Sequence, residues 1–333
     1  CAQHRARSSN RSEPGPIVTA AHLGMTNELV AALPHGTASH ELLRRLELDV
    51  RRRLDGLLHG DYRGLIPGHG SELGEAREYE PGDDVRRIDW NVTARLHETH
   101  VRETIADREL ETHLLVDLSP SIDFGTAQQE KRDLVVAAVA AVGTLTARIG
   151  NRIGAVIISP DGERSIPAKQ GRLHLLGILH RVVATPRSSG GSADLAKGIQ
   201  RLGTQARRRG LVVVASDFLA PPGWEQGLRR LATRHDVVAV EVVDPRELEL
   251  PDVGVITLTD PETGAQREIQ TGRASTRKRY AEAAAAQRGE IAAAITDAGA
   301  AHLQLRTDRD WLLDVAEFVV SRRKRMSAAK RPV

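Results

Sequence analysis

Three oxygen-bearing side chains at alternate positions, Asp117, Ser119 and Ser121, directly follow a short apolar run and are the first candidates for chemistry. A second apolar run leads into Asp217, and a Gly-Gly-Ser loop supplies the hydroxyl of Ser192. Oxygen ligands suit Mg²⁺, Mn²⁺ or Ca²⁺ and disfavour zinc, which prefers nitrogen and sulfur. The pattern therefore predicts a divalent-cation site, with Mg²⁺ as the expected ion in a cell.

The direct ligands of this site would be uncharged. We expect Ser119, Ser121 and Ser192 to bind the cation directly, and Asp117 and Asp217 to act mainly through water. A cation held in this way keeps much of its charge, so it attracts an anionic group, which an Asp or Glu of another protein supplies. The structural alternative is that Ser119 and Ser121 only cap a following helix.

Several enzyme classes with short signatures are excluded, because the chain has no Walker A string, no G-x-S-x-G elbow and no H-E-x-x-H helix. The string His97-Glu98-Thr99-His100 lies in a charged stretch without further ligands. The remaining enzyme hypothesis is a Mg²⁺-dependent phosphohydrolase with Asp117 as its nucleophile. That chemistry needs an acid or base carboxylate two residues later, where this chain has Ser119. We therefore expect a binding module and no enzyme.

The elements that position these residues alternate between short apolar runs and helical stretches from Glu111 onward. Such alternation, with strands too apolar to have a solvent face, predicts a doubly wound, mostly parallel sheet flanked by helices. Ligands bind such sheets beyond the carboxyl ends of strands where the winding reverses, so Asp117 and Asp217 should converge there. The expected elements are strands at 114–116, 153–158, 211–215, 237–243 and 302–305, a strand pair within 253–271, and helices at 131–149, 173–183, 195–202, 228–233, up to about 298, and from 308.

The chain before this domain divides into three parts of different composition. Residues 1–37 are rich in Ser, Arg, Pro and Gly and predict a flexible arm, and residues 38–59 contain an amphipathic helix. Residues 60–110 are densely charged and have no clear period, which predicts a compact lead-in of loops and short strands. We place the main domain at 111–325 and a basic tail at 326–333.

The bulk composition is that of an ordinary globular protein with an aliphatic core, since only 3% of residues are aromatic. The longest apolar run, 134–147, is too short to span a bilayer, which needs about 20 residues. A single cysteine fits a reducing compartment, so we expect a soluble, cytoplasmic protein. The net charge is only +3, and its basic excess lies at the two ends, so nucleic-acid binding through basic tails is a weak alternative.

The oxygen ligands resemble the metal-ion-dependent adhesion site of von Willebrand factor A domains. In this resemblance Ser192 stands where a threonine is usual and keeps the hydroxyl, while Asp194 is a candidate accessory ligand. The resemblance implies a von Willebrand factor A-like fold for the main domain. The matching positions are Asp117, Ser119, Ser121, Ser192 and Asp217.

A longer resemblance extends over about residues 60–320 and is to the bacterial family called domain of unknown function 58. It rests on the string REYEPGDDVRRIDW at 77–90, on Asp217-Phe218, on the stretch from Asp244 to Pro251, and on Pro261-Glu262-Thr263-Gly264. Members of that family are commonly encoded beside MoxR-type AAA+ ATPases. The resemblance thus implies an ATPase partner and an unknown client protein that is matured, remodelled or loaded with a cofactor.

The charged stretch before the sheet has two readings. Pro81-Gly82 predicts a turn with acidic and basic side chains on either side, and we expect Trp90 to anchor the segment on the sheet. These side chains form either a structural salt-bridge cluster or a docking surface for the ATPase. The candidate docking residues are Arg77, Tyr79, Asp83, Asp84, Arg86, Asp89, Trp90 and Arg95.

Overall fold

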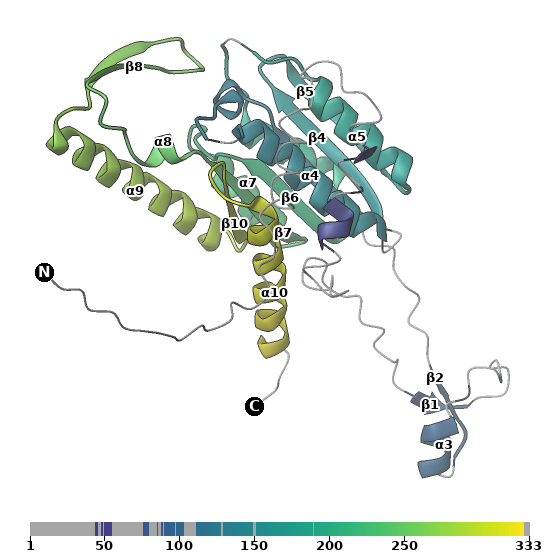
Figure 1. The fold of residues 1–333 in the computed structure, drawn as a ribbon. Helices are drawn as coiled ribbons and strands as arrows, with labels where there is room; N and C mark the ends of the chain where they lie inside the picture. The colour runs from purple at the N-terminus through teal and green to yellow at the C-terminus, as the bar shows by residue number, and fades with distance from the viewer. Residues whose placement is uncertain are drawn as a thin grey trace, which may run out of the picture.

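The computed structural model describes residues 44–45, 48, 50–54, 76–79, 85, 88, 90–96, 98–102, 111–127, 129–148, 151–188 and 190–329 (Figure 1). The arm predicted at 1–37 lies outside the described residues, as do Asp83, Asp84, Arg86 and Asp89 of the predicted docking surface.

The centre of the main domain is a six-stranded sheet in the order β10-β7-β6-β3-β4-β5. Neighbouring strands are parallel except for β5, which runs antiparallel to β4 at one edge. The chain winds outward from β3 in one direction and from β6 in the other, so the predicted doubly wound sheet is confirmed. The strands are β3 (Glu111–Asp117), β4 (Arg152–Ser159), β5 (Gly162–Lys169), β6 (Gly210–Ser216), β7 (Asp236–Val243) and β10 (Ala301–Arg306).

Helices cover both faces of this sheet and produce two hydrophobic cores (Figure 1). In β3, Leu114 and Val116 pack into one core and Leu115 into the other, as the alternation of side chains along a strand requires. One face carries α4 (Lys131–Arg148), α5 (Arg172–Ala184) and α10 (Trp311–Ala329). The other carries α6 (Leu195–Gln205), α7 (Trp224–Ala232) and α9 (Ala274–Asp297).

Residues 50–54 are helical, in agreement with the predicted amphipathic helix. Val50 and Leu54 are fully buried in the same core as α4 and α10, and Arg53 forms an ion pair with Asp310 at 2.9 Å. This helix therefore packs on the main domain. No described helix combines the length and apolar character needed to cross a membrane.

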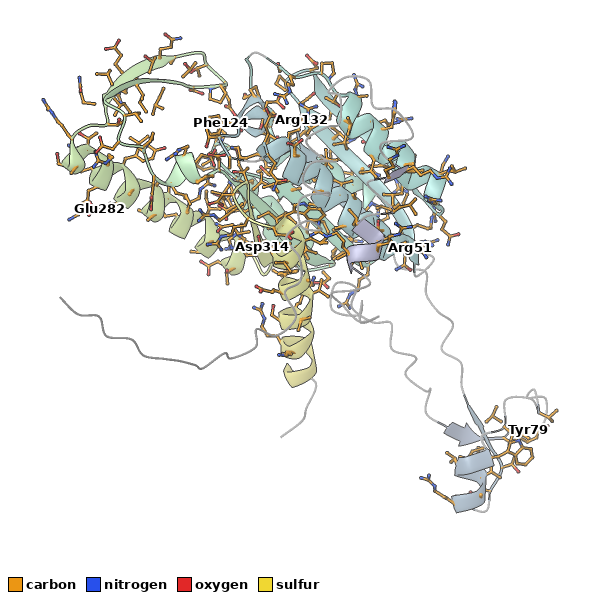
Figure 2. All side chains as sticks on the ribbon, in the orientation of Figure 1. Arg51, Tyr79, Phe124, Arg132, Glu282 and Asp314 are labelled. Carbon is orange, nitrogen blue, oxygen red and sulfur yellow. The ribbon has the colours of Figure 1, made fainter. Side chains whose placement is uncertain are left out.

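The charged lead-in contains two short antiparallel strands, β1 (Ala76–Glu78) and β2 (His100–Arg102), and the helix α3 (Trp90–Leu96), which was not predicted. Tyr79, labelled in Figure 2, is half-buried and donates its backbone N–H to the carbonyl of Thr99. Trp90 is 70% exposed, so the prediction that it anchors the segment on the sheet is wrong. Trp90 is the first residue of α3, and its ring lies in solvent. Arg95, near the other end of the helix, is also exposed.

The last third of the chain contains a separate hairpin, which lies between β7 and β10 in the sequence. β8 (Val255–Thr259) and β9 (Gln266–Gln270) pair antiparallel, which confirms the strand pair predicted at 253–271. The hairpin follows the short helix α8 (Pro245–Leu248) and precedes α9, and Figure 1 shows its turn directed back toward the main body.

Candidate cation site

Two aspartates lie at adjacent strand ends where the winding of the sheet reverses. Asp117 is the last residue of β3, and Asp217 directly follows β6, its parallel neighbour. The sequence predicted this convergence from the two apolar runs alone. The candidate cation site is defined here as Asp117, Ser119, Ser121 and Asp217.

Asp117 is 3% exposed and its carboxylate is held at both oxygens. Oδ1 accepts a hydrogen bond from the Ser119 backbone N–H at 2.9 Å, and Oδ2 accepts one from the Ser216 hydroxyl at 2.6 Å. Burial, and then the charge of Asp217, raise the pKa of Asp117 to about 6, against the opposing effect of these hydrogen bonds. Two buried carboxyl groups whose negative charges repel in this way favour the binding of a positive ion.

Ser119 and Ser121 lie in the turn that follows β3, where residues Pro120–Asp123 form one turn of 3₁₀ helix. Their hydroxyl oxygens are 3.0 Å apart, and a hydrogen bond from Ser121 helps to lower the pKa of Asp217. Ser119 stands at the N-cap position, yet its side chain makes no capping hydrogen bond. Helix capping therefore does not account for the Ser119 hydroxyl.

Lys131 is the principal neighbour of the site that the sequence did not reveal. Its fully buried ammonium donates hydrogen bonds to Asp217 Oδ2 at 2.8 Å and to Glu247 Oε1 at 2.5 Å. Burial acts to lower the pKa of Lys131, but the carboxylates of Asp217 and Glu247 raise it above its ordinary value. In turn, Lys131 overcomes the effect of burial on Asp217 and lowers its pKa. Asp217 is therefore charged and neutralised by an internal cation.

Arg288 of α9 extends this network of ion pairs across the carboxyl ends of the strands. Its guanidinium donates to the backbone carbonyl of Asp217, to Glu241 and to Glu247, each at 2.9 Å. Glu247 is held in α8 by a capping box with Asp244. The ion pairs thus connect the site to helices on both faces of the sheet.

The two residues predicted in the Gly-Gly-Ser loop are exposed. Asp194 accepts the backbone N–H of Lys197 at 2.8 Å and so caps α6. Among the described residues, Ser192 makes no hydrogen bond to Asp117, Ser119, Ser121 or Asp217. The structure therefore brings two aspartates and two serines together, while Ser192 and Asp194 lie on the neighbouring loop.

The donors of the candidate cation site fit a hard divalent ion. The group consists of oxygen atoms only, and both carboxylates already accept hydrogen bonds from protein groups, which leaves the serine hydroxyls as the natural direct ligands. Within the described ranges, no group of three or more His, Cys, Asp or Glu side chains could hold a metal ion. A cation here would depend on the hydroxyls.

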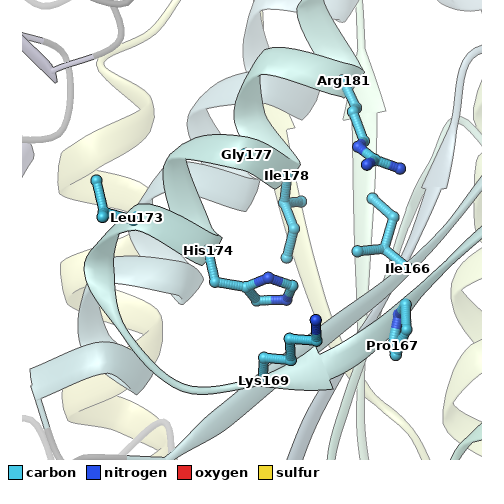
Figure 3. Close-up of a pocket in the computed structure, with 8 residues that line it drawn as sticks. All are labelled: Ile166, Pro167, Lys169, Leu173, His174, Gly177, Ile178 and Arg181. Atoms are coloured by element: carbon cyan, nitrogen blue, oxygen red, sulfur yellow. The ribbon is translucent and has the colours of Figure 1, made fainter.

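A hollow of about 190 Å³ lies elsewhere, between β5 and α5 (Figure 3). Figure 3 shows His174 and Ile178 directed from the helix toward the strand. His174 is within hydrogen-bond distance of the carbonyl of Ile153, near the start of β4 and so at the opposite end of that strand from the site. None of the lining residues belongs to the candidate cation site; they are Ile166, Pro167, Lys169, Leu173, His174, Gly177, Ile178 and Arg181.

The chain is similar to proteins of known sequence over most of its length. The family model described as "Protein of unknown function DUF58" matches residues 75–290. An uncharacterized protein of Mycobacterium bovis is 53% identical over 283 residues, which cover 85% of this chain and 89% of the relative. A protein of Mycobacterium tuberculosis, also described as uncharacterized, has the same identity and coverage.

Solved structures with a similar fold are much more distant. A conserved hypothetical protein BatB from Bacteroides thetaiotaomicron has 10% identity and a TM-score of 0.37, and covers 65% of this chain and 99% of its own. The SpRpn10 VWA domain has 14% identity and a TM-score of 0.35, and covers 64% and 95%. At this distance they carry no inference about what the site binds.

Proposed function

The chain belongs to the family described as "Protein of unknown function DUF58", and from the geometry of its site we propose that it is a cation-dependent protein-binding module. The observation that carries the proposal is the pair of serine hydroxyls, 3.0 Å apart, beside two buried strand-end carboxylates. Ser119 and Ser121 would hold Mg²⁺ directly, and Asp117 and Asp217 would support it through water. When bound, the ion supplies the positive charge that attracts a carboxylate of the partner protein.

The residues around the site favour an anionic partner. Lys131 already neutralises Asp217, so this carboxylate withdraws little charge from a cation bound beside it. Asp117 is held by Ser119 and Ser216, which limits its ability to turn and become a direct ligand. The open side of the cation would therefore retain the charge needed to bind Asp or Glu.

We further propose that the partner is a MoxR-type AAA+ ATPase, which would use the module to act on a client protein in maturation, remodelling or cofactor insertion. No catalytic step is assigned to Asp117, because both of its oxygens accept hydrogen bonds in a buried position. Turnover of an aryl phosphate with Mg²⁺, lost in Asp117→Asn, would overturn this assignment.

The test compares the wild-type chain with Asp117→Ala, in Mg²⁺ and in EDTA. Outer-shell changes at metal sites cost about 10- to 100-fold in metal affinity, so Asp117→Ala should weaken Mn²⁺ binding in calorimetry by about that factor. Capture of the purified MoxR-type ATPase should fall with Asp117→Ala and with EDTA. Asp161→Ala, in the exposed turn between β4 and β5, is the matched control and should behave as wild type. Capture unchanged in EDTA would contradict the proposal.

A further inference from the structure

The turn of the β8–β9 hairpin has a defined shape. Its residues are Asp260 and the Pro261-Glu262-Thr263-Gly264 string. Asp260 accepts hydrogen bonds from the Glu262 backbone N–H at 3.0 Å and from the Thr263 hydroxyl at 2.6 Å, and its carbonyl accepts the Gly264 N–H at 2.8 Å. These bonds fix the direction in which the turn presents Glu262 to the rest of the molecule.

This turn is attached to the loop beside the candidate cation site. The backbone N–H of Gly191 donates to the carbonyl of Glu262 at 3.0 Å. Gly191 has a φ of +89°, and a Cβ atom there would lie 3.1 Å from Pro160, so the close approach requires glycine. Pro160 follows the end of β4, where the carbonyl of Ile158 accepts the N–H of Leu118, the residue after Asp117. The turn, the loop and the site therefore all lie at the end of the sheet where the parallel strands have their carboxyl ends.

Glu262 differs from its neighbours in the turn. It is half-buried, whereas Pro261, Thr263 and Gly264 are exposed. Burial raises the pKa of Glu262, and the negative charge of Asp217 raises it further. Among the described residues, neither a basic side chain nor a hydrogen-bond donor pairs with the Glu262 carboxylate. A partly buried acid in this position lacks a counter-ion, and a cation at the site would supply one.

We propose that Glu262 is an internal carboxylate ligand of the candidate cation site, and that the β8–β9 hairpin thereby competes with the partner protein for the same cation. The inference rests on the proposed function, because the cation is the shared ligand. The hairpin is a separate two-stranded unit joined to the loop through Gly191, so it can leave the site without disrupting the central sheet. A partner with a stronger or better-placed carboxylate would displace it.

The test uses the full chain with Glu262→Gln, which keeps the size of the side chain and removes its charge. The matched control is Glu268→Gln on β9 of the same hairpin, where the side chain is exposed. Glu262→Gln should weaken Mn²⁺ binding by about tenfold in calorimetry, because the loss of one supporting group at a metal site lowers metal affinity by about that factor or more. In saturating Mg²⁺ it should bind the MoxR-type ATPase more tightly than wild type, because the internal competitor is gone.

A second measurement reports on the hairpin itself. Mg²⁺ should slow amide hydrogen exchange at residues 260 and 262–264 in the wild type and in Glu268→Gln, and leave it unchanged in Glu262→Gln. If Glu262→Gln matches wild type in cation affinity, capture and exchange while capture stays sensitive to EDTA, the inference is overturned and the proposed function stands. If wild type binds no Mn²⁺ and its capture is insensitive to EDTA, both are overturned.

Discussion

Lys131 has a buried charge that depends on two carboxylates. Its side chain is fully buried, Asp217 is 2% exposed, and the ammonium joins Asp217 to Glu247. Removing one partner of a buried ion pair leaves an uncompensated charge, which costs about 3–5 kcal/mol. We therefore expect Lys131→Met to lower the free energy of unfolding by about that amount, measured by urea denaturation at pH 7.5.

The control for Lys131 is Lys278→Met on α9. Lys278 is exposed and lies 3.8 Å from Glu282 in an i,i+4 pair, the kind of surface contact worth about 0.3–0.5 kcal/mol. Its replacement should change the unfolding free energy by no more than about 0.5 kcal/mol. Equal losses for the two variants would show that the buried pairs of Lys131 add nothing specific.

The sequence revealed the carboxylates of the site but not the two cationic side chains that bind Asp217. Asp117 and Asp217 were predictable because each ends an apolar run, and parallel strands bring such ends together. Lys131 and Arg288 lie in helices, where charged residues usually face solvent, and their partners are distant in sequence. A signal existed for Lys131, since a basic residue in the first turn of a helix opposes the helix dipole and so suggests a specific partner.

At the scale of an element, the start of α4 contains an acidic residue whose pKa is raised, as the pKa of Asp117 is. Asp133 is buried, and burial raises its pKa to about 6 although it accepts the backbone N–H of Glu130. A carboxyl group whose pKa is higher in the folded state binds protons more tightly there, so stability falls as pH rises from about 4 to about 6. We expect Asp133→Asn to remove this loss, which amounts to about 3 kcal/mol from the pKa difference.

The measurement is urea denaturation of wild type and Asp133→Asn at half-unit steps from pH 4 to 7.5 in EDTA. The variant should gain on the wild type by about 3 kcal/mol across this range, from the same pKa difference. Asp161→Asn, in an exposed turn, should follow the wild-type curve. Parallel curves for wild type and Asp133→Asn would show that the carboxyl titrates alike in the folded and unfolded states.

The elements found from sequence are those with a strong apolar period. The parallel strands and the helices α5 and α6 lie within a few residues of their predicted ranges, because both faces of the sheet are buried. β5 was missed, since only Ile166 and Ala168 of its residues are buried and an edge strand has few apolar positions. α3 was missed in the charged lead-in for the same reason: a seven-residue helix whose described side chains are half-buried or exposed has no apolar face to recognise.

At the scale of the whole molecule, the site connects layers that are otherwise separate. Lys131 belongs to α4 on one face of the sheet and Arg288 to α9 on the other, and both bind Glu247. Asp244 caps α8 and accepts hydrogen bonds from Thr126 and Thr307, which follow the ends of distant elements. A ligand at this edge therefore contacts groups whose positions depend on the complete fold, and binding should favour the folded state as a whole.

This coupling predicts that Mg²⁺ raises the thermal stability of the full chain. A ligand that binds only the folded state adds about 2.7 kcal/mol at a concentration of 100 times its dissociation constant, which corresponds to about 5–10 °C in Tm for a domain of this size. The rise should be present at pH 7.5, shrink at pH 5, where Asp117 with its pKa of about 6 is protonated so that the proton competes with the cation, and be reduced to about 0.4–1.4 kcal/mol in Asp117→Ala if the variant binds 10- to 100-fold more weakly. A scan of wild type and Asp117→Ala at both pH values, with Mg²⁺ or EDTA, measures all of these effects. A Mg²⁺ effect of equal size in the variant would place the stabilising ion elsewhere, because Asp117 is the carboxylate at the centre of the site.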